Sequence, residues 1–220
     1  MDLTPFEYSI LPVFQGLMFL GTGSLWIYLH GFKKKDYTYQ DFCPPSFVHA
    51  VLSSATSHYC LINYPNYLTD TLILNKPAPI VTLILPMISM SFSYYDVYIS
   101  CIYKRTDYLI HGLTLFGGIH YAYFTNVLPL SNLYSCLETS GIFLNLRPYC
   151  KHDAIDYLFV ITFIVYRFIF YPTILYYYFS QAPYDSGYII KLIISGTFFS
   201  LNAMWGKVIL KKLVKKIKNE

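Results

Sequence analysis

The stretch IDYLFVITFIVYRFIFYPTILYYYF, Ile155–Phe179, decides the class of fold. Its 25 residues contain one acid and one base, Asp156 and Arg167, and are otherwise almost wholly apolar or aromatic. A helix rises about 1.5 Å per residue, and the hydrocarbon core of a bilayer requires about 20 such residues. The stretch therefore predicts a membrane-spanning helix with a lone arginine near its middle.

The rest of the chain repeats this pattern. Of its 220 residues, 55% are hydrophobic and 13% are charged, whereas about a quarter of a soluble domain is charged. The sequence therefore predicts an all-α fold, a multi-pass transmembrane helical bundle of about seven helices. The fourth and fifth spans are the shortest, and they are either tilted helices or a helical hairpin that turns near Pro129. The expected spans are 9–30, 46–64, 79–103, 108–125, 130–146, 155–179 and 188–210.

Several function classes are disfavoured by the absence of their motifs. The five cysteines form no C-x-x-C pair, which predicts free thiols rather than a disulfide framework or a zinc site. No P-loop, H-E-x-x-H or G-x-S-x-G motif occurs. The net charge of +4 lies in short clusters between apolar segments, where it sets topology. We therefore expect no bound cofactor, no metal and no nucleic-acid partner.

The basic clusters predict the topology through the positive-inside rule. With a lumenal N-terminus and seven spans, nearly all lysines and arginines fall on the cytosolic side, together with the C-terminus. That side holds Lys33, Lys34, Lys35, Lys104, Arg105, Arg147, Lys151, Lys207, Lys211, Lys212, Lys215, Lys216 and Lys218, and the lumenal side holds Lys76 and Lys191.

The tail KKLVKKIKNE, Lys211–Glu220, has two interpretations. It is either a basic helix end that snorkels to anionic lipid, or a cytosolic retrieval signal of the endoplasmic reticulum. The second interpretation rests on Lys216 and Lys218, whose spacing resembles K-x-K-x-x.

Polar residues inside the spans repeat at helical spacing, so each span except the first is expected to turn one polar stripe inward. This pattern predicts a helical bundle or barrel with a polar interior. The stripes are His49, Ser53, Thr56 and Cys60; Ser89, Ser93, Asp96, Ser100 and Tyr103; Asp107, His111, Thr114 and Gly118; Glu138 and Asn145; Arg167 and Tyr171; and Ser195, Asn202 and Gly206.

Two constellations among these stripes are candidate functional groups. Glu138 and Arg167 lie at similar depth in consecutive spans, which predicts either a structural ion pair or a substrate-handling role. Asp107 precedes His111 by one turn, so the acid either orients that histidine as a general base or caps the helix.

Five segments resemble the TLC domain family, which includes ceramide synthases and smaller TLC-domain proteins. The first two are SFVHAVLSSATSHYCL with His49 and YYDVYI with Asp96. The third is DYLIHGLTLFGGIHYAYFTN with His111, and the fourth, LETSGIFLNLR, is similar to the E-x-S-x-x-x-x-N-x-R stretch of the small TLC proteins. The last is SLNAMWGKVILKK, with Asn202 and Trp205.

The resemblance implies a six-helix barrel in the endoplasmic reticulum membrane and a role with lipids. It divides the chain into an N-terminal helix with a basic cytosolic loop at 1–40, a TLC domain at 41–215 and a basic tail at 216–220. Ceramide synthases rely on an adjacent histidine pair and a later His-Asp pair. Here Gly112 stands at the second histidine, and Leu137 and Glu138 stand at the later pair.

Two functions remain open at this point. In the first, the protein binds a lipid or acyl chain in the barrel and acts in membrane lipid homeostasis. Its partners are then membrane lipids, and the sequence leaves open whether it forms a homodimer. In the second, it is a ceramide-synthase-like N-acyltransferase with acyl-CoA as co-substrate, in which His111 is the base or transient acyl acceptor. Asp107 or Asp96 would orient that histidine, and Glu138 would hold the acceptor amine.

The residues expected to line the barrel or bind lipid are His49, Asp96, Ser100, Asn145, Arg167, Asn202 and Trp205. A transporter is a weaker third interpretation, because no inverted repeat of hydropathy is found.

Overall fold

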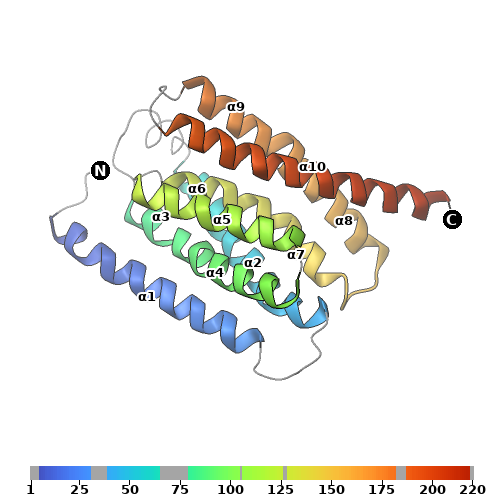
Figure 1. Cartoon of the computed structure of the whole chain (residues 1–220), viewed down its shortest axis with the longest axis horizontal. Coiled ribbons are helices and arrows are strands. Elements are labelled where there is room, and N and C mark those ends of the chain that lie inside the picture. The colour runs from blue at the N-terminus through green and yellow to red at the C-terminus, as the bar shows by residue number, and fades with distance from the viewer. Residues whose placement is uncertain are drawn as a thin grey trace.

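The computed structural model describes residues 5–30, 39–64, 79–104, 106–125, 128–181 and 187–218, and does not describe the side chains of residues 5–9, 39–42, 107, 128–129, 181 and 216–217. These ranges contain helices and no strand (Figure 1). The elements are α1 (Pro5–His30), α2 (Tyr39–Asn63), α3 (Ile80–Ile84), α4 (Pro86–Ile102), α5 (Thr106–Phe124), α6 (Leu128–Tyr134), η2 (Ser135–Glu138), α7 (Thr139–Leu146), α8 (Asp153–Ile164), η3 (Val165–Phe170), α9 (Tyr171–Gln181) and α10 (Tyr188–Lys218).

The predicted all-α, multi-pass bundle is confirmed, because helices occupy all seven predicted spans within the described ranges. Four helical stretches are long and apolar enough to cross a membrane: Ile10–His30, Ile80–Ile102, Asp153–Ser180 and Tyr188–Lys215. Among the described residues, the helical stretches α2, α5 and α6–α7 are not long and apolar enough to meet the same criterion. In α2 the reason is visible, because it carries buried polar residues such as His49, Ser53 and Ser57.

Prolines break two of the predicted spans into shorter elements. Pro86 begins α4 directly after the turn at Leu85, because a proline nitrogen has no N–H for the hydrogen bond that would continue α3. Pro172 likewise cannot donate to the carbonyl of Phe168. The residues just before this proline, Val165–Phe170, form the π-helix η3, whose hydrogen bonds reach one residue further than those of an α-helix.

Six of the seven predicted spans pack side by side to form a closed ring of helices. Neighbours in this ring are α2 with α4, α4 with α5, α5 with α10, α10 with α8 and η3, α8 with α7, and α7 with α2. The helix α6, which leads through η2 into α7, also contacts α5 and α2. Figure 1 shows α1 along one side of the molecule, where it packs on α4. The first span therefore lies outside the ring.

The prediction that the first span carries no polar stripe is wrong. Gln15 donates from Nε2 to the carbonyl of Leu83 at 2.9 Å, and Trp26 donates from Nε1 to Ser91 Oγ at 2.9 Å. His30 Nδ1 lies 2.9 Å from the hydroxyl of Tyr95. Positions 15, 26 and 30 fall on one helical face, so the periodicity was present in the sequence.

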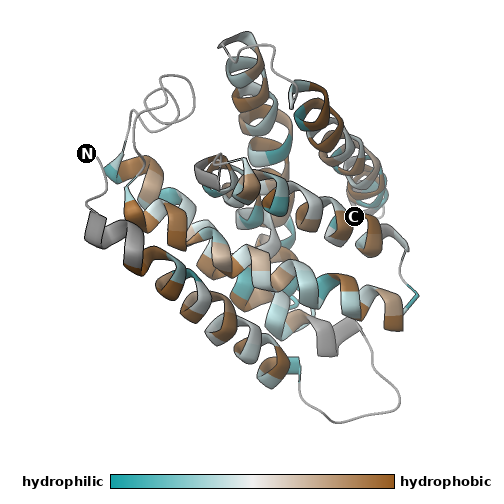
Figure 2. Ribbon diagram, turned by 60° about the vertical axis from the view of Figure 1, so that its left-hand side comes forward, coloured by the Kyte–Doolittle hydropathy of each residue, from teal (hydrophilic) through white to brown (hydrophobic). Residues whose placement is uncertain are grey.

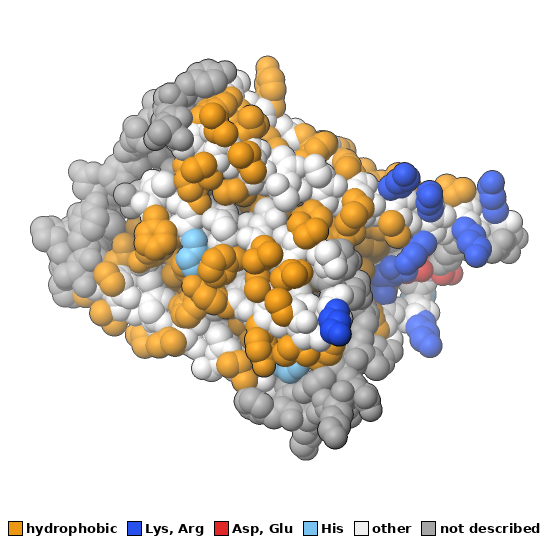
Figure 3. Space-filling view, viewed as in Figure 1, with side chains coloured by type: hydrophobic (Ala, Val, Ile, Leu, Met, Phe, Trp, Pro, Cys, Tyr) orange, Lys and Arg blue, Asp and Glu red, His pale blue; other side chains and the backbone are white. Residues whose placement is uncertain are grey.

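The outer surface is largely apolar, as expected for helices in lipid. Figure 2 shows hydrophobic residues along the length of the helices, and many large apolar side chains are exposed, among them Leu17, Ile161 and Ile193. In Figure 3 the lysine and arginine side chains gather toward one end of the molecule, over the C-terminal part of α10 and the helix ends beside it. The chain is a multi-pass membrane protein with one basic end.

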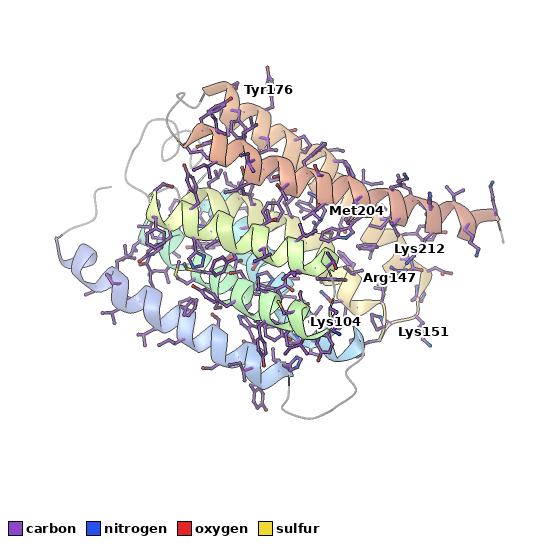
Figure 4. The ribbon with its side chains drawn as sticks, viewed as in Figure 1. Lys104, Arg147, Lys151, Tyr176, Met204 and Lys212 are labelled. Carbon is purple, nitrogen blue, oxygen red and sulfur yellow. The ribbon has the colours of Figure 1, made fainter. Side chains whose placement is uncertain are left out.

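The basic end joins residues that are far apart in the sequence. Figure 4 shows Lys104, Arg147, Lys151 and Lys212 at this end, whereas Tyr176 on α9 lies at the other. Of the basic residues used to predict topology, Lys33, Lys34, Lys35, Lys76 and Arg105 lie outside the described residues, and the side chain of Lys216 is not described.

Candidate functional site

His111 and Asp96 form a hydrogen-bonded pair between neighbouring helices of the ring. His111 Nδ1, on α5, lies 3.2 Å from Asp96 Oδ2, on α4, and the Asp96 side chain is only 3% exposed. The helices can come this close because the next residue is a glycine. A Cβ at Gly112 would lie 3.0 Å from Asp96 Oδ2 and 3.2 Å from the backbone nitrogen of Val97.

Asp96, one of the two acids that the sequence offered, therefore contacts His111. Asp107 belongs to the first turn of α5, but its side chain lies outside the described residues. A carboxylate on Nδ1 fixes the ring and leaves Nε2 able to accept a proton. The Phe198 and Trp205 rings of α10 flank the imidazole, with centroids 5.9 and 5.5 Å away.

His49, on α2, makes a second polar contact with α4. Its Nε2 lies 3.1 Å from Ser89 Oγ, which in turn lies 3.0 Å from Ser53 Oγ. The imidazole stacks on the Phe92 ring at a centroid distance of 3.9 Å and an interplanar angle of 4°. His49 is 2% exposed, so its ring is held firmly inside the bundle.

Glu138 stands at the junction between the 3₁₀ turn η2 and α7. Its carboxylate makes no hydrogen bond or ion pair with any residue that the structure describes. A Cβ at Gly141 would lie 3.2 Å from Glu138 Oε2, so a glycine one turn later leaves room for this acid. An acid in such surroundings is costly unless a polar partner reaches it.

Arg167 lies in the π-helix η3, and its side chain is buried inside the ring. Its Nη1 donates to Asn202 Oδ1 at 2.6 Å, its Nε to Ser140 Oγ at 3.1 Å, and its Nη2 to the carbonyl of Leu137 at 3.4 Å. The guanidinium also lies over the Trp205 ring, 5.8 Å from the centroid. A buried charge is stabilised here by three neutral acceptors and by ring faces.

The predicted ion pair between Glu138 and Arg167 is not formed. Among the described residues no carboxylate oxygen lies within 4.0 Å of this guanidinium, and its donors turn instead to Leu137, Ser140 and Asn202. The physical reason is the π-helix, which changes the angle between successive side chains and so shifts Arg167 from the position that an α-helix would give it.

Three cavities meet at these polar groups. The basic-end cavity lies among Tyr108, Arg147, Asp156, Trp205 and Lys212. The middle cavity shares Tyr108 and Trp205 with it and adds His49, Asp96, His111, Glu138 and Asn145. The apolar cavity shares His49, His111 and Glu138 with the middle one, and Arg167 borders all three.

The apolar cavity is the part of this system suited to a hydrocarbon chain. The space between its lining residues amounts to about 920 Å³, a figure that includes solvent at its open mouth. Its polar end carries His49, His111, Ser89, Glu138 and Arg167. Lys191, near the start of α10, also lines the cavity. The remaining wall is mostly apolar and aromatic, formed by Leu115, Ile119, Ala122, Leu130, Tyr134, Leu137, Tyr171, Tyr178, Ile194 and Phe198.

The remaining predicted residues are also buried inside the ring, but not all of them border a cavity. Asn145 lines the middle cavity and donates to the carbonyl of Gly141 at 2.8 Å. Asn202 is 1% exposed and acts on the site through Arg167. Ser100 is 2% exposed, and its hydroxyl has no hydrogen-bond partner among the described residues. Sequence reasoning did not assign roles to Ser89 and Ser140, which contact His49 and Arg167, although Ser89 belonged to a predicted stripe.

A metal site is not supported by this geometry. Within the described part of the chain, no group of three His, Cys, Asp or Glu side chains could hold a metal ion.

The sequence and the structure were compared with family models, curated proteins and solved structures. A family model described as the TLC domain matches residues 45–211, about three quarters of the chain. No curated protein and no solved structure matches the chain.

Proposed function

The chain belongs to the TLC domain family, and from this premise we propose that it binds a lipid or acyl chain inside its helical ring and acts in membrane lipid homeostasis. The observation that carries the proposal is the carboxylate of Glu138, which makes no hydrogen bond or ion pair with a described residue and lies at the polar end of the apolar cavity. A ligand with a hydrocarbon chain and a hydrogen-bond donor or cation at its head would satisfy both parts of this cavity.

The proposed location is the endoplasmic reticulum membrane, with the basic end and the C-terminus in the cytosol. Two features support it. Apart from the buried Arg167 and from Lys191 near the start of α10, the described lysines and arginines gather at one end, as the positive-inside rule requires of a cytosolic face. The C-terminal lysines have the spacing of a retrieval signal. No resident cofactor is proposed, and the proposed partners are membrane lipids.

We expect Ala122→Phe to remove co-purifying lipid from the protein. Ala122 lines the apolar cavity and is 6% exposed, so a phenyl ring there would occupy space that the hydrocarbon chain needs. The measurement is native mass spectrometry of protein extracted in mild detergent, with the bound lipid quantified per protein chain. We expect lipid occupancy to fall at least tenfold.

Leu113→Phe is the matched control on the same helix, because Leu113 is 51% exposed on the outer surface. It should keep the occupancy of the wild type. A second arm uses Glu138→Gln, which keeps the shape of the cavity and should release lipids with a cationic head. Equal lipid occupancy in Ala122→Phe, Leu113→Phe and the wild type would contradict binding in the apolar cavity.

A second candidate function is acyl transfer from acyl-CoA to a lipid amine, and the pair of His111 and Asp96 favours it. With Nδ1 held by the carboxylate, Nε2 of His111 would take a proton from the amine as that amine attacks the thioester carbonyl, and it would give the proton to the sulfur of CoA as the carbon–sulfur bond breaks. His111 lines both the middle and the apolar cavity, where the two substrates would meet.

We expect His111→Ala and Asp96→Asn each to lower transfer of a labelled acyl group from acyl-CoA by about 10²–10⁴-fold, the usual contribution of a general base. His120→Ala is the matched control, because His120 Nε2 instead lies 2.8 Å from the hydroxyl of the exposed Tyr94. Absence of turnover in a wild-type protein that retains lipid would reject this candidate and leave lipid binding intact.

A further inference from the structure

Ser89 and His49 form a second candidate centre on the wall of the apolar cavity. Their side chains are 5% and 2% exposed, and both border that cavity, which lies on the inner side of the ring. The distance of 3.1 Å from Ser89 Oγ to His49 Nε2 is that of a serine hydroxyl that donates to an imidazole. This centre does not include the pair of His111 and Asp96.

The surroundings of the pair fix this arrangement. Phe92 stacks flat against the imidazole at 3.9 Å, and the Trp26 ring meets the imidazole edge-on at a centroid distance of 6.0 Å. Ser53 Oγ lies 3.0 Å from Ser89 Oγ, so Ser53 can donate to Ser89 while Ser89 donates to His49. Such a directed chain of hydrogen bonds polarises the middle hydroxyl.

A purely structural role would be to hold α2 against α4 through this hydrogen-bonded chain. That role requires no contact with the cavity, and Ser53 illustrates it, because Ser53 does not line any of the three cavities. Ser89 differs because it borders the space where we place a hydrocarbon chain. The position of Ser89 at the cavity wall is the observation that points to chemistry.

We propose that Ser89 is a nucleophile, activated by His49, that takes the acyl group of an ester or thioester bound in the apolar cavity. This inference rests on the proposed function in one respect, since it needs the acyl chain to lie in that cavity. It adds a covalent serine ester, and hence an acyl hydrolase or transacylase activity, at residues that have no part in the transfer by His111.

The reaction balances without a cofactor. Ser89 Oγ attacks the acyl carbonyl carbon while its proton moves to His49 Nε2, and the bond to the alcohol or thiol of the substrate breaks as that leaving group takes the proton. Water, or the hydroxyl or amine of a second lipid, then gives a proton to His49 and attacks the serine ester; the bond from the acyl carbon to Ser89 Oγ breaks, and Ser89 takes that proton back from His49. The products are the freed alcohol or thiol and a fatty acid or newly acylated lipid.

The test is covalent labelling with a long-chain alkyl fluorophosphonate, applied to the full-length protein in mild detergent. We expect one adduct per chain, located on Ser89 by mass spectrometry of the digested protein. His49→Gln should slow labelling by about 10²–10⁴-fold, the usual effect of losing a general base. Ser93→Ala is the matched control, because Ser93 is buried on the same helix and donates to its own backbone, the carbonyl of Met90, at 2.7 Å.

Either of two results would overturn the inference: an unlabelled wild type that is folded by size-exclusion chromatography, or an adduct that persists in Ser89→Ala. If Ser89→Ala does not fold, the folded Ser89→Cys variant takes its place, and it too must lose the adduct. Bound lipid is measured in the same samples. Lipid without an adduct rejects the nucleophile alone, whereas a lipid-free wild type rejects the proposed function.

Discussion

Arg167→Lys is expected to lower the thermal unfolding midpoint of the detergent-solubilised protein by roughly 5–15 °C, which corresponds to about 2–4 kcal/mol for a chain of this size. The arginine directs three separate donors at Asn202, Ser140 and the carbonyl of Leu137. A lysine keeps the buried charge but gathers its donors on one atom, so it cannot reach acceptors spread around a planar fork. The positive charge of the lysine then stays buried inside the ring of helices without most of the hydrogen bonds that stabilise the arginine.

Arg147→Lys is the matched control. Arg147 also makes a close contact, from Nε to Asp156 Oδ1 at 2.7 Å, but the two side chains are 38% and 33% exposed. An exposed pair of this kind contributes about 0–1 kcal/mol, and lysine can replace arginine in it. The measurement is the fraction of protein that remains monodisperse after heating, followed by size-exclusion chromatography. Similar midpoints for the two variants would show that Arg167 is not held by its three acceptors.

The contrast between these two arginines shows what the sequence could predict and what it could not. Helical periodicity placed Arg167 on an inward face, because side chains that repeat every three or four residues share one side of a helix. It also placed Asp96, His111 and Glu138 inside. These residues border the connected cavities, so the composition of the polar interior was readable from single helices.

The hydrogen-bonding and ion-pair partners of these inward-facing residues were harder to predict from the sequence, because they depend on how neighbouring helices are aligned along and around their axes. Glu138 was expected to pair with Arg167, but the π-helix at Val165–Phe170 changes the direction of the arginine side chain. Pro172 was the available signal, since its missing N–H disturbs the hydrogen bonds of the preceding turn. The length of that disturbance depends on packing against α7 and α10, which local sequence does not specify.

The choice between Asp96 and Asp107 as partner of His111 shows the same dependence. Both acids were compatible with the sequence, one through a helical turn and one through an adjacent helix. The structure shows Asp96 in contact with His111, at a point where Gly112 lets α4 and α5 approach each other closely, whereas the side chain of Asp107 lies outside the described residues. Ceramide synthases, which the sequence resembles, carry a histidine at the position of Gly112. Here the side chain is absent, and the carboxylate of the neighbouring helix lies close to that position.

Gly112→Ala is expected to destabilise the protein and to separate His111 from Asp96. The added Cβ would lie 3.0 Å from Asp96 Oδ2, 3.1 Å from Val97 Cγ2 and 3.2 Å from the Val97 backbone nitrogen. A helix backbone cannot move aside as a flexible side-chain tip can, so α4 must shift away from α5. Overpacking of this kind costs about 1–3 kcal/mol, which exceeds or offsets the gain of about 1 kcal/mol from placing alanine in a helix.

Gly117→Ala isolates the packing effect, because Gly117 lies on the same helix and a Cβ there would meet nothing within 4 Å. It gains the same helix propensity without the collision, so its unfolding midpoint should equal or exceed that of the wild type. Gly112→Ala should unfold below Gly117→Ala by roughly 2–10 °C, given about 2–4 °C for each kcal/mol in a chain of this size. If both alanines raise the midpoint equally, α4 does not approach α5 closely at Gly112, and the contact of Asp96 with His111 needs another explanation.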